Sequence, residues 1–280
     1  MNRDENSGEP VLIIVAPNGA RLSKQDHPEV PVTPQEMASC AWNCQQAGAA
    51  MVHLHARDAD GLHSLDADLN QHYLDVVRAK VGDRLILQLT TESVGRYSPA
   101  EQMNLLRRCR PEAASIALRE IVPDKASEAM AQDFFQELVE TGMICQLIMY
   151  SAADIHRYFQ LVSEQVLNGL VHHLLLVIGR HASAQGQALT EMLACLHLGL
   201  RWAVCAFGKP EYRLTTAAMA LNGDVRVGFE NNRWSHLGCI AEDNAQLVRQ
   251  SVQMANLLNR PVLSAQQFRE LMRLPIGDDT

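Results

Sequence analysis

Short apolar runs alternate with amphipathic stretches along the chain. Eight runs rich in Val, Ile, Leu and Ala each end in polar residues. They span residues 11–16, 50–55, 85–90, 113–118, 143–149, 173–179, 201–207 and 224–229. Runs of this length, bounded by turn residues, are typical of buried strands. The pattern therefore predicts eight strands.

The stretches between these runs predict helices. Thr33 and Ser98 are typical helix N-caps, and each is followed by a proline, Pro34 or Pro99, at the start of an amphipathic segment. Strands spaced by roughly 25 to 35 residues, with a helix in each gap, are parallel strands joined by crossover connections. Eight such units fit a closed (β/α)8 TIM barrel better than an open sheet.

No linker or change of composition divides the chain. Residues 244–261 and 264–274 supply the last helix of the barrel and one extra C-terminal helix. We therefore predict a single (β/α)8 catalytic domain over residues 11–280, preceded by a flexible N-terminus over residues 1–10.

Composition narrows the possible partners and locations. The net charge of −8 argues against nucleic acid or an anionic membrane as the main partner, because both usually require a basic surface. No run of about eighteen apolar residues occurs, and residues 1–9 are too polar for a signal peptide, so a cytoplasmic protein is expected.

The seven scattered cysteines are typical of buried thiols in a reducing compartment. Cys40 and Cys44 lie one helical turn apart, but no second pair stands near them, so their spacing does not indicate a zinc site.

Two histidines at the end of the second run are the first candidates for chemistry. Functional residues of such barrels follow the C-terminal ends of the strands. His53 and His55 are two apart on a strand, so both imidazoles point to the same face and can reach one atom. Hydrogen-bonded histidines in a packed barrel are the alternative, and the position at a strand end favours metal binding.

Glu230 offers a third ligand. It follows the eighth run, which in a closed barrel adjoins the first and lies close to the second. Two histidines, one carboxylate and an open position form a catalytic zinc set. A loop carboxylate that caps the next helix is the alternative reading of Glu230.

Cations gather at the same predicted rim. Each lies in or just after one of the apolar runs, and together they are Arg21, Arg57, Arg96, Arg119, Arg180, Lys209 and Arg226. In an acidic protein, this distribution indicates an anionic substrate or a phosphate-bearing cosubstrate. For two or three of these residues, an ordinary surface arginine remains an equally good interpretation.

Several motifs together resemble the beta-keto acid cleavage enzyme family over about residues 11–274. They are APNGA followed by P-x-V-P-V-T-P-Q-E, then AGAAMVHLHARDADG, VRVGFENN, and NAQLV followed by AQQFREL. The resemblance implies a zinc-dependent (β/α)8 enzyme, with zinc held by His53, His55 and Glu230. It implies that a beta-keto acid condenses with acetyl-CoA and that the adduct splits into acetoacetate and a new acyl-CoA. A homotetramer is the assembly that the resemblance suggests.

The resemblance also assigns substrate-binding residues. Hydroxyls suited to holding a substrate carboxylate fall on Thr90, Thr91 and Ser115, and the family's arginine is retained as Arg226. The aspartate that follows the metal-binding glutamate, which in the family pairs with this arginine and removes the substrate proton, is Asn231 here. An amide cannot serve as that base.

Two further positions depart from the family's pattern. The family's enzymes for amino-bearing substrates carry an acidic residue after Gly-Ala, and this chain has Arg21 at that position. With Arg119 nearby, this positive charge argues against an amino-bearing substrate. Glu92 replaces a glycine after the Thr pair. It has two open roles, as the displaced base or as an ion-pair partner of Arg21 or Arg119.

Two other function classes stay open at this point. A metal-dependent hydrolase of the amidohydrolase kind also uses H-x-H on a barrel strand, but it needs further histidines, and His181 is the one good candidate. A metal-binding relative without this activity is the other, and Asn231 motivates it.

Overall fold

The computed structural model describes residues 8–170, 173–180, 185–197 and 199–273. Within these residues, eight parallel strands form a closed barrel in chain order, with β1 paired to β8. The strands are β1 (Ile13–Val15), β2 (Met51–Leu54), β3 (Ile86–Thr90), β4 (Ala113–Ala117), β5 (Ile144–Met149), β6 (His173–Ile178), β7 (Arg201–Ala206) and β8 (Asp224–Val227). The predicted (β/α)8 TIM barrel is confirmed, and each strand lies within its predicted apolar run.

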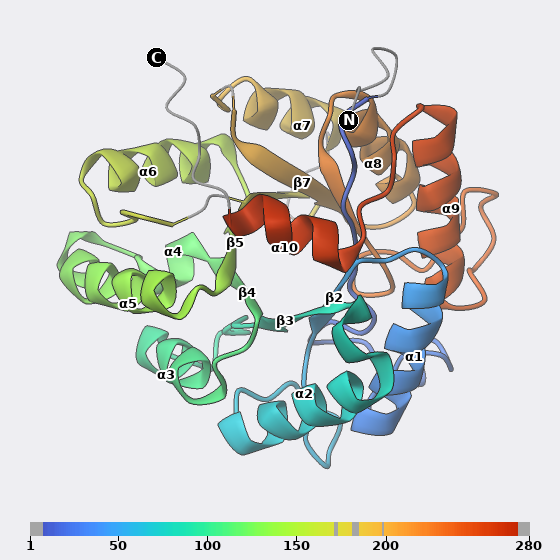
Figure 1. The fold of residues 1–280 in the computed structure, drawn as a ribbon, viewed down its shortest axis with the longest axis horizontal. Helices are drawn as coiled ribbons and strands as arrows, with labels where there is room; N and C mark the ends of the chain where they lie inside the picture. The colour runs from blue at the N-terminus through green and yellow to red at the C-terminus, as the bar shows by residue number, and fades with distance from the viewer. Residues whose placement is uncertain (1–7, 171–172, 181–184, 198, 274–280) are drawn as a thin grey trace.

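Helices α1 to α9 surround the barrel as a ring, and α10 lies across one end (Figure 1). The helices are α1 (Pro34–Gln46), α2 (Ala67–Val81), α3 (Pro99–Cys109), α4 (Leu118–Ile121), α5 (Glu128–Thr141), α6 (Ala152–Ser163), α7 (Gln185–Leu193), α8 (Glu211–Ala220), α9 (Asn244–Leu257) and α10 (Ala265–Arg273). Short 3-10 turns cover Gly82–Arg84 and Lys125–Ser127. The one-turn helix α4 and the two 3-10 turns were not predicted from the periodicity.

The predicted N-caps explain where two helices begin. The Thr33 hydroxyl accepts from the backbone N–H of Glu36, whose carboxylate in turn accepts from the Thr33 N–H. Ser98 and Glu101 make the same reciprocal pair at α3. Such capping boxes satisfy N–H groups that have no partner within the helix.

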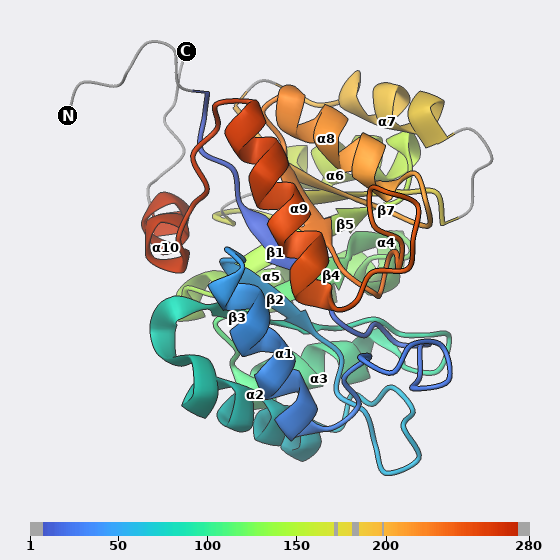
Figure 2. The ribbon, with the colours of Figure 1, turned by 90° about the vertical axis from the view of Figure 1, so that its right-hand side faces the viewer.

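The extra helix α10 closes one end of the barrel. Figure 1 shows it across the near end of the strands, and Figure 2 shows it from the side, beside the N-terminal part of the chain. Phe268 and Met272 of α10 pack with Ile14, Met51 and Ile86 in a buried apolar cluster. The functional loops therefore lie at the opposite end, where the strands finish.

None of the helices within the described residues is long and apolar enough to cross a membrane. The predicted domain boundaries remain predictions, and residues 1–7 of the predicted flexible N-terminus lie outside the described residues.

Candidate metal centre

His53, His55 and Glu230 meet at the end of the barrel where the strands finish. His53 lies in β2, His55 follows it, and Glu230 lies three residues beyond the last residue of β8. The two imidazole Nε2 atoms are 3.1 Å apart. Glu230 Oε2 lies 3.2 Å from Nε2 of His55 and 3.5 Å from Nε2 of His53. Each of the three side chains offers one ligand atom to a common point.

The arrangement fits a tetrahedral metal ion. Ligand atoms at about 2.0–2.1 Å from zinc in tetrahedral geometry are roughly 3.3–3.4 Å from one another, which is close to the three separations here. Both imidazoles are 1% exposed, and the buried Oε2 atom of Glu230 has no hydrogen-bond partner. A buried carboxylate oxygen without a partner is costly unless a ligand completes its interactions. The three residues can therefore hold a metal ion.

Two glycines bring the loops after β1 and β8 together. Gly228 has a φ of 131°, and a Cβ atom there would lie 2.5 Å from the carbonyl oxygen of Ala16. A Cβ atom on Gly19 would lie 2.6 Å from Cγ of Glu230. Because neither position tolerates a side chain, the loop holds Glu230 against the first strand, where its N–H donates to the Ala16 carbonyl.

Charge around the centre keeps the ligands in metal-binding states. Burial raises the pKa of Glu230, but the Arg226 guanidinium and the two imidazoles outweigh it and hold this pKa well below its usual range. Arg226 Nη2 donates to Glu230 Oε1 at 2.9 Å. Burial lowers the pKa of His53 to about 3, so its imidazole is neutral. A neutral imidazole and an ionised carboxylate are the forms that bind metals.

A small chamber adjoins the centre and opens into a cleft. Chamber and cleft measure about 20 Å³ and about 290 Å³, and Glu92, Arg180, Phe207 and Glu230 line both of them. The polar lining of the chamber comes from the three candidate ligands with Thr90, Glu92, Arg180 and Arg226, and its apolar lining comes from Ala117, Ile148, Val177 and Phe207, which pack together with Tyr150. A substrate on the metal would thus meet both polar groups and hydrocarbon.

The predicted hydroxyl residues lie at different depths. Thr90 lines the chamber, and its hydroxyl accepts from the Glu92 N–H. Ser115 is buried with its hydroxyl unpaired, but it is not among the chamber-lining residues. Thr91 also lies outside that lining, and its hydroxyl donates to the Ser115 carbonyl. Thr90 is therefore the hydroxyl in direct reach of the chamber.

Glu92 forms ion pairs at the chamber wall. Its Oε1 lies 2.5 Å from Arg180 Nη2 and 3.2 Å from Arg21 Nη1, and its Oε2 lies 4.0 Å from Nδ1 of His55. Burial raises the pKa of Glu92, but His55 and Arg180 together lower it by more than burial raises it, so this pKa lies below its usual value. The side chain is therefore ionised.

The predicted rim cations do not all face the site. Arg57 is buried, and its guanidinium donates to the backbone carbonyls of Gly19, Leu22 and Gly61. This arginine ties two loops together through its terminal nitrogens, while its buried Nε has no partner. Arg119 lies over the Tyr150 ring, 3.8 Å from its centroid, and Lys209 lies over Trp234 at 4.0 Å. His181 lies outside the described residues.

Asn231 lies in the cleft with unused hydrogen-bonding capacity. It is 4% exposed, and neither side-chain amide atom has a partner. The sequence prediction missed Gln88, whose Oε1 lies 2.8 Å from Nδ1 of His53. The signal in the sequence that could have found it is a single glutamine inside an apolar strand run.

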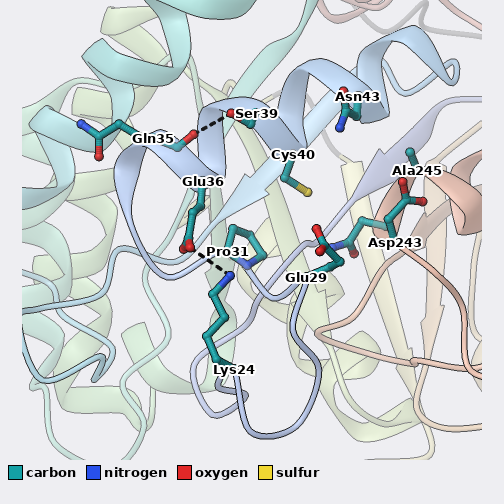
Figure 3. Close-up of a pocket in the computed structure, with 11 residues that line it drawn as sticks. Lys24, Glu29, Pro31, Gln35, Glu36, Ser39, Cys40, Asn43, Asp243 and Ala245 are labelled. Carbon is teal, nitrogen blue, oxygen red and sulfur yellow. Dashed lines mark hydrogen bonds and ion pairs between the residues drawn. The ribbon is translucent and has the colours of Figure 1, made fainter.

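A separate cleft of about 410 Å³ lies between α1 and the start of α9 (Figure 3). Lys24 pairs there with Glu36, and Asp243 caps α9. None of the predicted site residues lines this cleft, so it is distinct from the candidate metal centre.

Comparisons with known proteins agree along the whole barrel. A family model described as beta-keto acid cleavage enzyme matches residues 10–274. The chain is 27% identical to a 3-keto-5-aminohexanoate cleavage enzyme of Fusobacterium nucleatum, covering 95% of this chain and 98% of that protein. It is also 27% identical to a 3-oxoadipate:acetyl-CoA acetyltransferase of Cupriavidus necator, with 95% and 96% covered.

Solved structures show the same fold at lower identity. The binary complex of ObcA with oxaloacetate superposes with a TM-score of 0.73 at 17% identity, covering 89% of this chain and 68% of that one. A type I 3-dehydroquinate dehydratase from Clostridium difficile gives 0.61 at 11% identity, covering 90% and 94%.

Proposed function

The chain belongs to the beta-keto acid cleavage enzyme family, and we propose that it is a zinc-dependent member that condenses a beta-keto acid with acetyl-CoA and releases acetoacetate and a new acyl-CoA. The observation that carries the proposal is the convergence of His53, His55 and Glu230 beside a chamber with both polar and apolar lining. Relatives whose names specify acetyl-CoA as a substrate support the second reactant.

The proposed reaction conserves every group. The acetyl group joins the carbon between the keto and carboxylate groups of the substrate, and the CoA thiolate leaves. The thiolate then adds to the original keto carbon, and the bond between that carbon and its neighbour breaks. The carbanion that this releases takes back the proton removed from the substrate at the start, so that acetoacetate leaves. Zinc held by the two histidines and Glu230 would act as a Lewis acid on the keto oxygen. The same residues, with Arg226 behind Glu230, keep the binding site rigid.

Glu92 is proposed as the group that takes the first proton. Among the residues that line the chamber, the carboxylates are Glu92 and Glu230, and Glu230 is committed to the metal. Glu92 is ionised and fixed by Arg180, so it can accept a proton without prior reorganisation. Asn231 keeps the position of the family's aspartate and offers an amide to the substrate instead of a base. The hydroxyl of Thr90, which lines the chamber, is proposed to hold the substrate carboxylate.

The proposed substrate is a beta-keto acid without an amino group. Arg21 and Arg180 stand at the cleft, and they share one carboxylate, that of Glu92. A substrate ammonium group would therefore meet excess positive charge, whereas a neutral chain fits the apolar lining and an additional anion fits the arginines. Arg119 lies on the Tyr150 ring beside that lining.

A substrate screen tests the proposal. We expect acetyl-CoA-dependent release of acetoacetate with some neutral or dianionic beta-keto acids, and slower release with an aminated keto acid of equal length. A clear preference for the aminated substrate would contradict the substrate class. Hydrolysis without acetyl-CoA would favour a hydrolase, and metal binding without any turnover would favour a relative that lacks this activity.

The homotetramer and the cytoplasmic location are further parts of the proposal. Light scattering coupled to gel filtration checks the tetramer, for which a mass of about four chains of 31.1 kDa is expected.

A further inference from the structure

A row of buried polar side chains runs through the barrel interior away from the metal centre. Gln88 of β3, Gln146 of β5, His173 of β6 and Asp224 of β8 form this polar row. The row begins at His53, whose Nδ1 lies 2.8 Å from Gln88 Oε1. Gln88 Nε2 then lies 3.3 Å from Gln146 Oε1, and Gln146 Nε2 lies 3.3 Å from His173 Nδ1. His173 Nε2 lies 3.4 Å from Asp224 Oδ2.

These side chains are unusual for their place. Bulky branched apolar residues dominate the interior layers of such barrels, yet all four members of the polar row are at most 1% exposed. Burying polar groups costs free energy unless they are hydrogen-bonded, and a connected row meets that requirement only if every member keeps one orientation. The donors of the row therefore all point the same way along it, each toward the acceptor of its neighbour.

Asp224 sets that direction at the far end. Its two oxygens accept from Nε and Nη2 of Arg201, each at 2.7 Å, and Oδ1 also accepts from the Leu12 N–H. An ionised carboxylate can only accept hydrogen bonds, so Asp224 Oδ2, 3.4 Å from Nε2 of His173, favours the tautomer with the ring proton on Nε2, an atom that has no other partner. Burial lowers the pKa of His173 more than Asp224 raises it, so this ring is neutral and its Nδ1 carries a lone pair.

Each hydrogen bond of the row fixes the orientation of the next side chain, from His173 to Gln146, Gln88 and His53. The lone pair on His173 Nδ1 requires the amide NH2 of Gln146 to face it, which turns the Gln146 carbonyl toward Gln88. That carbonyl accepts from the Gln88 NH2 group, which turns the Gln88 carbonyl toward His53. The Gln88 carbonyl can only accept, so His53 carries its proton on Nδ1 and presents the Nε2 lone pair to the metal centre.

We propose that Asp224, acting through His173, Gln146 and Gln88, fixes the metal-binding tautomer of His53, and that these four residues are positioning residues of the metal centre. This inference rests on the metal centre of the proposed function. His55 differs, because its Nδ1 atom has no hydrogen-bond partner and lies 4.0 Å from Oε2 of Glu92. Partners of the second ring nitrogen commonly orient a metal-binding histidine.

Helix α10 protects the far end of the row. The Phe268 ring packs against the His173 ring, with centroids 5.4 Å apart, and the Arg201 guanidinium lies 5.5 Å from the Phe268 centroid. Phe268 is fully buried, so it covers His173 with hydrocarbon. An apolar cover favours the fixed direction, because no water replaces a member of the row.

Gln146→Met interrupts the row without touching a metal ligand or the Asp224–Arg201 ion pair. We expect nitrogen chemical shifts of the metal-free wild type to show the His53 proton on Nδ1, and those of Gln146→Met to show a mixture with Nε2–H. Zinc affinity, measured by competition with a chromogenic chelator, should fall about 10- to 100-fold in the variant. The tautomer is read without metal or turnover, so this result is independent of whether the proposed reaction occurs.

Gln250→Met is the matched control, because Gln250 is a buried glutamine on α9 whose Oε1 accepts from the His236 N–H outside the barrel interior. It should change neither the tautomer nor the zinc affinity. If Gln146→Met fails to fold, Asp224→Asn provides the test from the far end, where an amide NH2 facing His173 would reverse the row. An unchanged His53 tautomer and unchanged affinity in a folded variant of either kind would overturn the inference, as would an Nε2–H tautomer in the wild type.

Discussion

The two polar regions of the barrel interior differ in how their hydrogen-bonding capacity is used. At the functional end, the side chains that have buried polar atoms without a hydrogen-bond partner include His55, Ser115, Arg226, Glu230 and Asn231. Below them, each successive pair in the polar row lies within 3.4 Å. Both regions are buried, so solvent does not explain the difference.

The difference separates groups that await a ligand from groups that fix geometry. An unpaired buried polar atom costs about 1–3 kcal/mol, a cost that a ligand can remove. In the polar row each side chain faces the next, with the longest separation, 3.4 Å, between His173 and Asp224, so the row holds its neighbours in one orientation. The unpaired atoms therefore outline the ligand site, and the paired row supports it.

Removal of a metal ligand should have the largest effect. We expect wild type to bind one zinc per chain, and His53→Ala and His55→Ala each to lose the metal and all measurable turnover, because two remaining ligands hold zinc poorly. Elemental analysis of the purified proteins measures this. His63→Ala is the control, since the His63 ring lies beside that of His55, with centroids 4.9 Å apart, but its Nε2 donates to the Glu92 carbonyl and it is not a candidate ligand. Full zinc occupancy in either ligand variant would remove that histidine from the site.

Glu92→Gln keeps the size of the side chain and removes its charge. As the proposed base, Glu92 should contribute about 10²- to 10⁴-fold to turnover, so kcat should fall by that factor while zinc content stays constant. Steady-state kinetics and metal analysis on one preparation check both. Adding Asn231→Asp in this background should restore part of the rate. Near wild-type turnover would instead make Glu92 a structural partner of Arg21 and Arg180.

The smallest expected effect is the contribution of His173, in the polar row, to the pH dependence of stability. The pKa of His173 in the folded protein is lowered from 6.5 by burial, against the opposing effect of Asp224. Above about pH 6.5, the His173 ring is neutral in both the folded and the unfolded chain. Below this pH, the ring takes up a proton in the unfolded chain but not in the folded chain. The free energy of unfolding therefore decreases as the pH decreases, by at most about 1.4 kcal/mol per pH unit. Urea unfolding of wild type and His173→Gln at pH 7 and pH 5 should show the larger loss in wild type. Equal losses would mean that His173 contributes nothing to the pH dependence.

The fold followed from local patterns. Each strand was a short apolar run and each gap held an amphipathic segment, so order and type of the elements could be predicted from the sequence. The convergence of His53, His55 and Glu230 could be predicted for the same reason, because each stands at a strand end and barrel closure brings those ends together.

Side-chain partners could not be predicted in this way. Arg57 was read as a rim cation, but its guanidinium binds loop carbonyls, a contact that depends on how the loops after β1 and β2 turn. Gln88, Gln146 and His173 stand singly within or at the head of apolar runs. Their connection depends on which interior positions of different strands share one level, and no periodicity within a single run contains that information.

Closure of the barrel has a consequence for synthesis on the ribosome. Strand β1 pairs with β8, and the Leu12 N–H finds its partner, Asp224, 212 residues later. At about 5–20 residues per second, roughly 10–40 seconds separate the two segments as they emerge. During that interval β1 presents an apolar strand with one unpaired edge, the form most open to pairing with another nascent chain. Whatever shields the growing chain in the cell must therefore act on its first strand until its eighth is made.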